Sequence, residues 1–514
     1  MFVTKNLPKI SEPVKGAVSL DANDNGLDIM LSPCGTPVKE ITLTWDLDIT
    51  KFDYISTQPW GFSPYGKLGF YKINEEEISA CYFTILKGDE AHCFGVKTGC
   101  NSFCSWRINK SSITLVVDVR NGGEGVDLLN PLHCATVIST VSTAGEAVFS
   151  TTKRFCSLMC DKPKLPKIPI YGSNTWYHTY GDNMSRESVL QDADLCALLA
   201  SCRVDGAPEP YMVIDDGWSS TRVPHLFNGG PYIPSENFGD MKILAEEISA
   251  KGCRPGIWIR PLSFRSTLIP QILPDECFLE NQDWGMQAEH GYAKMLDPTT
   301  KGAQDYIYSM VNSLATGGYK LIKFDFTACD LLGLDFLKPN LVTPGWHLHN
   351  RHITNAQATK ELYTLIQNAA EGSITISCNT YTHLAAGISE VMRIGADTSG
   401  RNWADTKKNG INSLVYRACE NNTLYATDAD CAAFTAKVPT DKNLMFAELI
   451  AKFNSALFIS AHPGILKPKD IEKLIELFRL SSMGCEEATP IDWKEEPRPT
   501  SYLWNGKEYS FNWD

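Results

Sequence analysis

The second part of the chain alternates short apolar runs with longer stretches of helical periodicity, and this rhythm constrains the fold more than any other feature. It begins near Ile170 and continues for about 290 residues. Such alternation is typical of βα units around a parallel sheet, and eight units of this length predict a (β/α)8 barrel. The predicted strands are residues 170–175, 211–215, 255–259, 321–325, 374–378, 391–395, 424–427 and 456–460, with helices such as 356–370 and 443–454 between them.

The chain before this region has the periodicity of β structure, from about residue 17 to residue 157. Apolar and polar residues alternate in short runs such as 41–45, 81–85 and 113–117. Turn-forming residues, for example Asn121-Gly122-Gly123, separate these runs. Short strands at such intervals predict an antiparallel β-sandwich.

Two further signals divide the chain. The proline-rich stretch 161–169 favours extended backbone and predicts a semi-rigid linker. Near the C-terminus, Asn505-Gly506 lies between aromatic runs, which predicts a β-hairpin. We therefore expect a multidomain α/β protein with an N-terminal β-sandwich (1–165), a (β/α)8 TIM barrel (166–480) and a small C-terminal β element (481–514).

The charge balance excludes some classes of partner. The net charge is −13, and the densest basic cluster, Lys162 to Lys167, is interrupted by prolines. Nucleic-acid binding needs a concentrated basic face, so no nucleic-acid partner is expected. No run approaches the eighteen apolar residues of a membrane-spanning helix. We expect no membrane association, and a homo-oligomer stays open.

The cysteines and the N-terminus bear on location. Many of the seventeen cysteines lie inside apolar runs, where a reduced thiol behaves as a small hydrophobic group. No Cys-x-x-Cys pair is present, so a reducing compartment is favoured. The first ten residues lack the apolar run of a secretory signal. A cytoplasmic location follows, while a periplasmic or secreted one stays open should a signal peptide have been removed.

Acidic residues follow four of the predicted barrel strands. Asp215 and Asp216 end the second strand, Asp325 the fourth and Asp397 the sixth, and Asp428 and Asp430 follow the seventh. A single aspartate at such a place is more often a helix N-cap. Barrel enzymes, however, carry their catalytic groups at the C-terminal ends of strands, and four such ends together favour an active site.

Two carboxyl groups suffice for glycoside hydrolysis with retention of configuration. One attacks the sugar while the other protonates the leaving oxygen and later activates water. Asp325 suits the nucleophile, because Lys323 lies two residues earlier on the same strand face and favours its ionised form. Asp397, at a separate strand end, suits the acid/base. No metal and no organic cofactor is needed.

These motifs resemble glycoside hydrolase families 27 and 36, the clan of retaining α-galactosidases with (β/α)8 barrels, and family 36 most closely. The likeness covers roughly residues 171–463 and rests on Val-Ile-Asp-Asp-Gly-Trp at 213–218, Lys-Phe-Asp at 323–325 and Arg393 four residues before Asp397. It implies Asp325 as nucleophile and Asp397 as acid/base. It further implies sugar-binding roles for Asp215, Asp216, Lys323 and Arg393, with Trp176 and Trp258 as apolar walls of the pocket.

The chain departs from family 36 after the fifth strand. The family's glycine-rich segment, which ends in arginine and reads the sugar's 2-position, is replaced by Cys378-Asn379-Thr380-Tyr381-Thr382-His383. Cys378 and Asn379 are accordingly expected in the sugar site, but galactose does not follow. The N-terminal sandwich is also short for the family, and the C-terminal domain is nearly absent.

Several alternatives stay open. His347, His349 and His352, with Asp330 or Asp335, could form a metal site, although their spacing fits no common ligand pattern and a polar loop is favoured. His383 could line the pocket, and Trp60 could reach it from the sandwich, although a core aromatic is favoured. The expected activity is hydrolysis of a terminal α-linked sugar, most similar to an α-galactoside, with a glycoside or oligosaccharide substrate. A non-catalytic carbohydrate-binding relative or a transglycosylase on the same barrel is the alternative.

Overall fold

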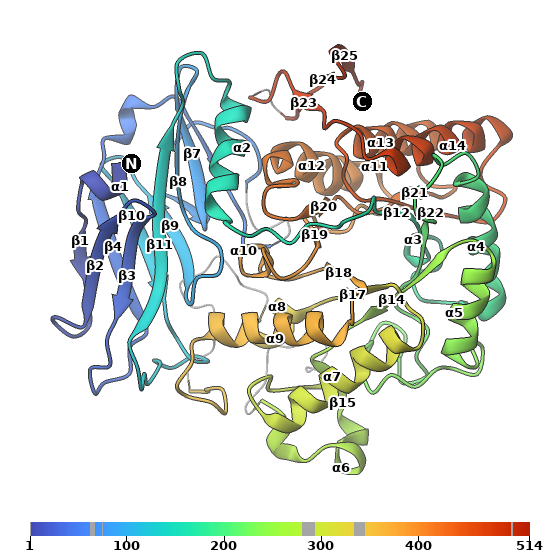
Figure 1. Cartoon of the computed structure of the whole chain (residues 1–514), viewed down its shortest axis with the longest axis horizontal. Coiled ribbons are helices and arrows are strands. Elements are labelled where there is room, and N and C mark those ends of the chain that lie inside the picture. Colours follow the sequence, from blue (N-terminus) through green and yellow to red (C-terminus); the bar gives the residue numbers. More distant parts are fainter. Residues whose placement is uncertain (1, 62–66, 74–75, 280–292, 334–344, 495–496) are drawn as a thin grey trace.

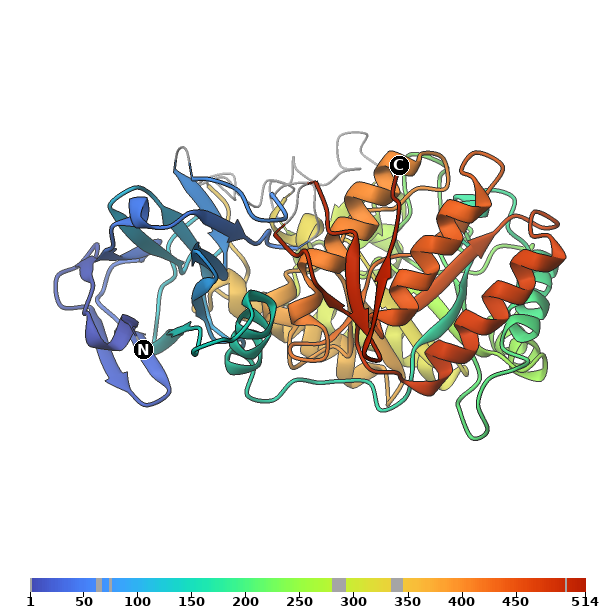
Figure 2. The same ribbon diagram turned by 90° about the horizontal axis from the view of Figure 1, so that it is seen from above.

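The computed structural model shows a β-sandwich beside a barrel, with both chain ends on the surface (Figure 1). It describes residues 2–61, 67–73, 76–279, 293–333, 345–494 and 497–514. Viewed from above, the sandwich and the barrel lie side by side, and the C-terminal strands lie against the barrel helices (Figure 2).

The barrel strands are parallel and lie in chain order around the sheet. Their order is β20-β19-β18-β17-β14-β13-β12-β22-β21, and nearly every strand residue is buried, as expected for a sheet covered on both faces. Each predicted strand is confirmed to within two residues. The strands are β12 (Tyr171–Asn174), β13 (Tyr211–Ile214), β14 (Arg254–Ile259), β17 (Leu321–Phe324), β18 (Ile374–Ser377), β19 (Val391–Arg393), β20 (Ala426–Asp428), β21 (Ala432–Phe434) and β22 (Leu457–Ala461).

The seventh barrel strand is split into two pieces, and the split closes the ring. β20 pairs with β19 on one side, whereas β21, three residues further along, pairs with β22 on the other. Asp430 lies in the break with a positive φ of 75°. A parallel bridge between Asp428 and Ala456 adds a second link across the same seam. Because of the break, the first piece of the seventh strand pairs with one neighbouring strand and the second piece pairs with the other. Asp430, between the two pieces, lies at the rim of the barrel.

A helix follows each strand of the barrel and covers its outer face (Figure 1). Helix α9 begins with a reciprocal cap in which Thr354 and Gln357 each bond the other's backbone N–H. The predicted helices 356–370 and 443–454 correspond to α9 and α13. The helices that follow the strands are α4 (Arg186–Leu199), α5 (Met241–Ala250), α7 (Lys301–Thr316), α9 (Asn355–Ala369), α10 (Thr382–Ala385), α12 (Asn412–Tyr416), α13 (Thr440–Lys452) and α14 (Pro468–Met483). Shorter helices are α1 (Phe2–Lys5), α3 (Trp176–Thr179), α6 (Ile269–Ile272), α8 (Thr327–Leu332) and α11 (Trp403–Asp405).

The N-terminal region is an antiparallel sandwich, as predicted. Its two sheets have the orders β1-β4-β10-β9-β6 and β2-β3-β11-β8-β7-β5. Alternate residues point into a core that contains Trp45 and Trp106, whose rings lie 5.8 Å apart. The strands are β1 (Lys9–Ser11), β2 (Val18–Asn23), β3 (Gly26–Leu31), β4 (Glu40–Asp46), β5 (Tyr54–Thr57), β6 (Glu77–Ala80), β7 (Tyr82–Lys87), β8 (Glu90–Val96), β9 (Phe103–Ile108), β10 (Ser112–Asp118) and β11 (Leu132–Val141). A short pair, β15 (Ser263–Arg265) and β16 (Ala293–Met295), forms a separate sheet between β14 and α7.

The expectation of β structure as far as residue 157 is wrong for its last part. Residues Val148–Met159 form helix α2, which packs between the sandwich and the barrel (Figure 1). Its buried side chains, including Phe149, Phe155 and Met159, recur at helical spacing. A short apolar stretch with two adjacent threonines has the composition of a strand, so tertiary packing overrides local propensity here.

A buried polar cluster joins the sandwich to the barrel. The Tyr82 hydroxyl on β7 donates to Glu420 Oε1 at 2.7 Å. Arg417 donates to Glu420 Oε2 from Nε at 3.0 Å and to the carbonyl oxygen of Gly61 at 2.6 Å. All three side chains are at most 3% exposed. Their hydrogen bonds matter because a buried charge without partners is costly.

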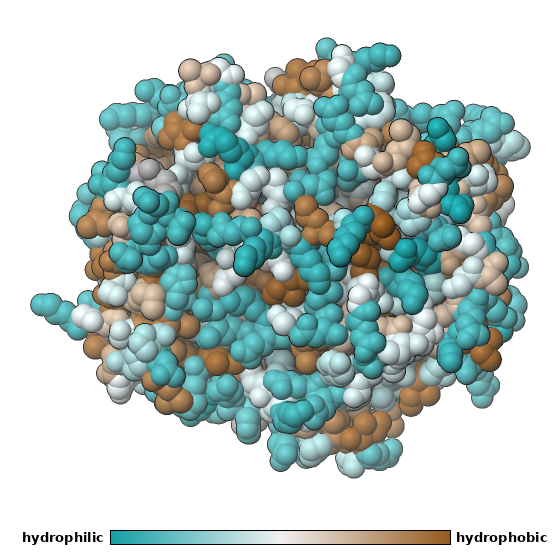
Figure 3. Space-filling model, in the orientation of Figure 1, coloured by the Kyte–Doolittle hydropathy of each residue, from teal (hydrophilic) through white to brown (hydrophobic). Residues whose placement is uncertain are grey.

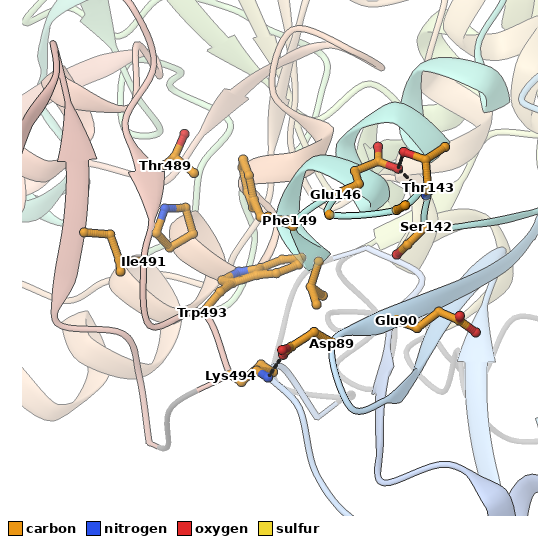
Figure 4. A pocket seen from close by; sticks show the side chains of 15 residues that line it. Asp89, Glu90, Ser142, Thr143, Glu146, Phe149, Thr489, Ile491, Trp493 and Lys494 are labelled. Carbon is orange, nitrogen blue, oxygen red and sulfur yellow. Dashed lines mark hydrogen bonds and ion pairs between the residues drawn. The ribbon is translucent and has the colours of Figure 1, made fainter.

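The C-terminal segment ties the two regions together at the surface. Strands β23 (Thr489–Pro490), β24 (Ser501–Trp504) and β25 (Lys507–Ser510) form a small sheet, and Asn505 and Gly506 make the predicted hairpin turn with φ of 47° and 70°. Figure 4 shows where this segment meets the sandwich, around a cavity of about 750 Å³. There Trp493 packs on Phe149 with ring centroids 5.1 Å apart, and Lys494 pairs with Asp89 at 2.8 Å.

The face of the molecule shown in Figure 3 carries no broad apolar patch. In Figure 3 hydrophobic residues lie in small groups among hydrophilic ones. Within the described part of the chain, no helix is both long and apolar enough to cross a membrane.

The interface cluster makes a testable contribution to stability. Tyr82→Phe removes the donor to Glu420 and leaves a buried carboxylate oxygen short of one partner, which costs about 1–3 kcal/mol. We expect the free energy of unfolding, measured by urea denaturation, to fall by that amount. Tyr54→Phe, at an exposed position on β5, is the matched control. Equal stabilities of the two variants would contradict a structural role for the Tyr82 hydroxyl.

Candidate active site

Asp325 follows β17 and is fixed by three N–H donors. Trp258 Nε1 donates to Oδ2 at 3.0 Å, whereas Asn379 Nδ2 and the Phe326 backbone N–H donate to Oδ1 at 2.6 and 2.7 Å. Phe326 adopts a positive φ of 61°, which turns its N–H back onto the carboxylate. Asp325 is 6% exposed, so both oxygens are held in a fixed orientation in a nearly closed setting.

Lys323 lies on the same strand as Asp325 but pairs directly with Asp215. Its Nζ is 2.8 Å from Asp215 Oδ2, which also accepts from Asn174 Nδ2 at 2.7 Å. The sequence predicted that Lys323 acts directly on Asp325. In the structure Lys323 instead forms an ion pair with Asp215, at the end of the second barrel strand. Burial alone would lower the pKa of Lys323, but the charge of Asp215, with smaller effects from Cys378 and Asp325, raises it well above its usual value.

Asp216 is buried and paired with a guanidinium group. Its Oδ2 accepts from Arg222 Nε at 3.1 Å and from Asn228 Nδ2 at 3.4 Å, and its backbone N–H donates to Asp215 Oδ1 at 3.0 Å. Burial raises the pKa of Asp216 to about 6 in spite of Arg222, and the Asp215 charge adds to the rise.

Asp397, unlike Asp215, Asp216 and Asp325, is exposed to solvent. Its side chain is 64% accessible, although protein surrounds it on several sides. Arg393, at the end of β19, donates from Nη2 to Asp397 Oδ1 at 3.0 Å. The pKa of Asp397 is raised by partial desolvation, which Arg393 opposes, and the Asp430 and Asp325 charges add to the rise while Lys323 reduces it.

The two predicted aromatic walls differ in setting. Trp258 is buried on β14 and contributes a hydrogen bond to Asp325 as well as its apolar ring. Trp176 starts helix α3, where its backbone N–H donates to Asn174 Oδ1 at 2.8 Å. Its ring is partly exposed beside Tyr180, with centroids 5.5 Å apart.

The loop after β18 connects the site to the sandwich. Asn379 has a positive φ of 47° and directs its amide to Asp325, while Cys378 Sγ lies 4.0 Å from Arg393 Nη1. His383 is buried, and the pKa of its ring is lowered to about 4 by burial, with the backbone of Lys97 and Val96 of the sandwich nearby. It thus belongs to the junction of the two regions.

Trp60 also lies at this junction. Its ring packs between Phe103 and Tyr381, with centroids 5.4 and 6.2 Å away, as a core aromatic. The next residue, Gly61, approaches the backbone so closely that an added Cβ would lie 2.6 Å from the Thr380 carbonyl oxygen. This loop of the sandwich therefore packs against the loop that follows β18.

The ten predicted site residues lie near the C-terminal ends of the barrel strands, and their contacts form three groups. One group is built on Asp215, one on Asp325 and one on Arg393, and electrostatic effects on Lys323 link the three. The members are Asp215, Asp216, Trp176, Trp258, Lys323, Asp325, Cys378, Asn379, Arg393 and Asp397. Their individual roles remain predictions.

Asp430 was predicted as a strand-end acidic residue, but its partners were not, and the Arg260–Asp330 pair was not predicted. Asp430 accepts hydrogen bonds from Tyr177, Arg393 and Thr398, and the second aspartate of Asp428-Ala-Asp430 was the available signal. Arg260, 0% exposed, forms two hydrogen bonds with Asp330 at 2.8 and 2.6 Å. Its position two residues after Trp258, on the same strand face, would have indicated a place near the pocket.

The histidine-rich loop does not form a metal centre among the described residues, where no group of three or more potential ligands occurs. His347 Nδ1 contacts the Leu348 carbonyl oxygen at 2.9 Å, and His352 Nδ1 contacts that of Asp127 at 2.7 Å. Asp330 is held by Arg260, and Asp335 lies outside the described residues.

Comparison with known proteins adds a structural likeness. No protein-family model and no curated protein matches the sequence. Solved structures match over nearly the whole chain. An α-galactosidase from Thermus thermophilus, in complex with p-nitrophenyl α-D-galactopyranoside, is 14% identical with a TM-score of 0.64 and covers 98% of both chains.

Two further structures have the same arrangement. A family 36 α-galactosidase from Geobacillus stearothermophilus, in complex with raffinose, is 12% identical with a TM-score of 0.65 and covers 95% of this chain and 71% of that one. An α-galactosidase from Lactobacillus brevis is 11% identical with a TM-score of 0.63 and covers 98% and 74%. The chain has the fold of family 36 α-galactosidases. The expected barrel with an N-terminal sandwich is thereby confirmed, and at this level of identity the likeness concerns the fold alone.

Burial of the Asp428 carboxylate lowers the free energy of unfolding, and the size of this penalty depends on pH. Burial raises the pKa of Asp428 to about 6 from 3.8, Arg393 opposes the rise and Asp430 adds to it. Because the folded-state pKa is raised, the penalty is complete above pH 6 and disappears as the pH falls towards 4. Two pKa units correspond to about 3 kcal/mol.

We expect Asp428→Asn to raise the free energy of unfolding by about 3 kcal/mol at pH 8 and by about 1 kcal/mol near pH 4.5. Urea denaturation at the two pH values measures the difference. Asp194→Asn, which removes an exposed partner of Lys251, is the control and should have a small effect at both. A gain that does not vary with pH would rule out the titration of Asp428 as its cause.

Proposed function

We propose that the protein is a retaining α-glycosidase that removes a terminal α-linked, galactoside-like sugar by double displacement. The observation that carries the proposal is the contrast between two carboxyl groups at one end of the barrel. Asp325 is nearly closed off and oriented by three N–H donors, whereas Asp397 is open to solvent and its pKa is raised. A nucleophilic carboxylate must be ionised and fixed in orientation, which the three N–H donors favour, and an acid that must hold a proton at rest needs a raised pKa.

In the first step Asp397 gives its proton to the glycosidic oxygen while Asp325 attacks the anomeric carbon. The bond to the leaving group breaks, and a glycosyl ester forms on Asp325. In the second step Asp397, now ionised, takes a proton from water, and the resulting hydroxide attacks the same carbon. The ester breaks, Asp325 is released, and two inversions give net retention.

The surrounding groups suit the handling of a neutral sugar. The Lys323 and Arg393 cations and the Asp215 and Asp216 carboxylates offer charge-assisted hydrogen bonds to hydroxyl groups. Trp176 and Trp258 offer apolar surface to the sugar ring. The galactosides and oligosaccharides bound in the structural neighbours favour an α-galactoside, although the altered loop at Cys378 and Asn379 leaves room for another sugar.

The substrate and the nucleophile can be tested together. We expect one member of a panel of p-nitrophenyl α-glycosides (galactoside, N-acetylgalactosaminide, glucoside, arabinoside) to be hydrolysed. Asp325→Ala should lower kcat/KM by about 10⁴-fold or more, since without the nucleophile no ester can form. Turnover by the wild type that survives in Asp325→Ala would disprove the assignment. Silence of the wild type across the panel, with sugar binding detected by calorimetry, would favour the non-catalytic relative.

The acid/base is tested by varying the leaving group. Asp397→Ala should lower kcat/KM by about 10²–10⁴-fold for a phenyl glycoside, which needs protonation, and much less for a 2,4-dinitrophenyl glycoside, which does not. Added azide should restore turnover of the activated substrate and give the glycosyl azide of retained configuration. An azide product of inverted configuration, seen by NMR, would contradict the ester intermediate. A large yield of transfer product with an added sugar acceptor would favour the transglycosylase.

A further inference from the structure

Asp430 collects an unusual number of donors on a single oxygen. Its Oδ2 accepts from the Tyr177 hydroxyl, from Arg393 Nη2, from the Thr398 backbone N–H at 2.8 Å and from Thr398 Oγ1 at 3.1 Å. Its Oδ1 accepts from the Cys431 backbone N–H at 2.7 Å. The side chain is 3% exposed, so this carboxylate is held by protein and not by bulk water.

Two of these donors lead directly to Asp397. Thr398 is the next residue in the chain, and its N–H belongs to the peptide unit that Asp397 begins. The same Nη2 atom of Arg393 that donates to Asp430 also donates to Asp397 Oδ1 at 3.0 Å. Asp430 thus fixes the backbone beside Asp397 and competes with it for one guanidinium group.

We infer that Asp430 is a positioning residue for Asp397, which it keeps in place through Thr398 and keeps protonated by sharing the charge of Arg393. A carboxyl group that faced Arg393 alone would ionise more readily, because an opposite charge at contact distance stabilises the carboxylate. The split of the seventh strand is what makes this possible, since it brings Asp430 to the rim with a positive φ. The inference rests on the proposed role of Asp397 as the acid.

The other charged and titratable groups around Asp397 do not replace Asp430. Lys323 and Asp325 act on it from the end of β17 with opposite signs, and Arg393 acts from β19. Around Asp430 itself lie Tyr177 on α3, Asp428 on β20 and Cys431, together with Arg393 and Asp397. Among these groups, Asp430 combines a carboxylate charge with contacts to both Arg393 and Thr398.

Asp430→Asn tests the inference because it removes the charge and keeps the shape. Both consequences have the same sign: Asp397 loses a repelling neighbour, and Arg393 is left to it alone. We expect the pKa of Asp397 to fall by about one unit. The measurement is a ¹³C NMR titration of the substrate-free protein labelled at its aspartate carboxyl carbons, with the Asp397 signal assigned by its absence from Asp397→Asn.

Tyr177→Phe is the matched control. It removes a neutral donor from the same oxygen and leaves the charge, so the pKa of Asp397 should stay near the wild-type value. An unchanged or higher pKa in Asp430→Asn would overturn the inference, and so would an equal fall in Tyr177→Phe. Should Asp430→Asn not fold, as judged by its thermal unfolding, Asp430→Ser removes the same charge and has the same expected result.

The kinetic readout separates this inference from the proposed function. For an active wild type, the alkaline limb of kcat/KM reports the acid in the free enzyme and should move to lower pH by the same amount in Asp430→Asn. A fall in the pKa of Asp397 by NMR in a protein that hydrolyses no glycoside would contradict the function and support the positioning. Hydrolysis with no change in the pKa of Asp397 or in the alkaline limb would support the function and contradict the positioning role of Asp430.

Discussion

The pairing of buried charges between strands constrains the C-terminal end of this barrel. Aspartates gather there because four strand ends converge, and burying them without partners would cost several kcal/mol each. Lys323 on β17 binds Asp215 from β13, and Arg393 on β19 binds Asp430 from the break in the seventh strand. Lys323 thus links β17 to β13 across the intervening β14, and Arg393 links β19 to the segment that follows its neighbour β20. Charge neutralisation and barrel geometry are satisfied by the same contacts.

The same pairing gives the two central carboxyl groups different environments. Lys323 is occupied by Asp215, so Asp325 is oriented mainly by N–H groups of Trp258, Asn379 and Phe326. Arg393 is shared between Asp397 and Asp430, and the pKa of Asp397 is raised by desolvation and by the Asp430 charge in spite of Arg393. Asp325 and Asp397 are chemically identical side chains, but they have different environments because Lys323 is paired with Asp215 and Arg393 is shared with Asp430.

The strand positions could be predicted from the sequence because burial on both faces leaves apolar runs of fixed length, and each run ended within two residues of its prediction. The strand-end aspartates followed from that register. The partners did not: Lys323 binds Asp215 in place of Asp325, and Asp430 anchors Arg393. Such contacts depend on the curvature of the closed sheet and on the break in its seventh strand, which no local pattern encodes. Helix α2 was missed for a similar reason, since its helical form depends on packing between two regions.

The loop after β18 shows why the fold can persist at 11–14% identity while the substrate need not. The barrel requires only buried apolar strands and paired charges, which many sequences satisfy. Asn379, by contrast, donates to the oxygen of Asp325 that Phe326 also holds, and the sandwich loop at Gly61 supports the same segment from behind. A change in this loop that alters sugar selection therefore also alters how Asp325 is oriented. In the proposed function, substrate choice and nucleophile geometry would therefore be coupled in this loop, which could not vary as freely as the strands that carry it.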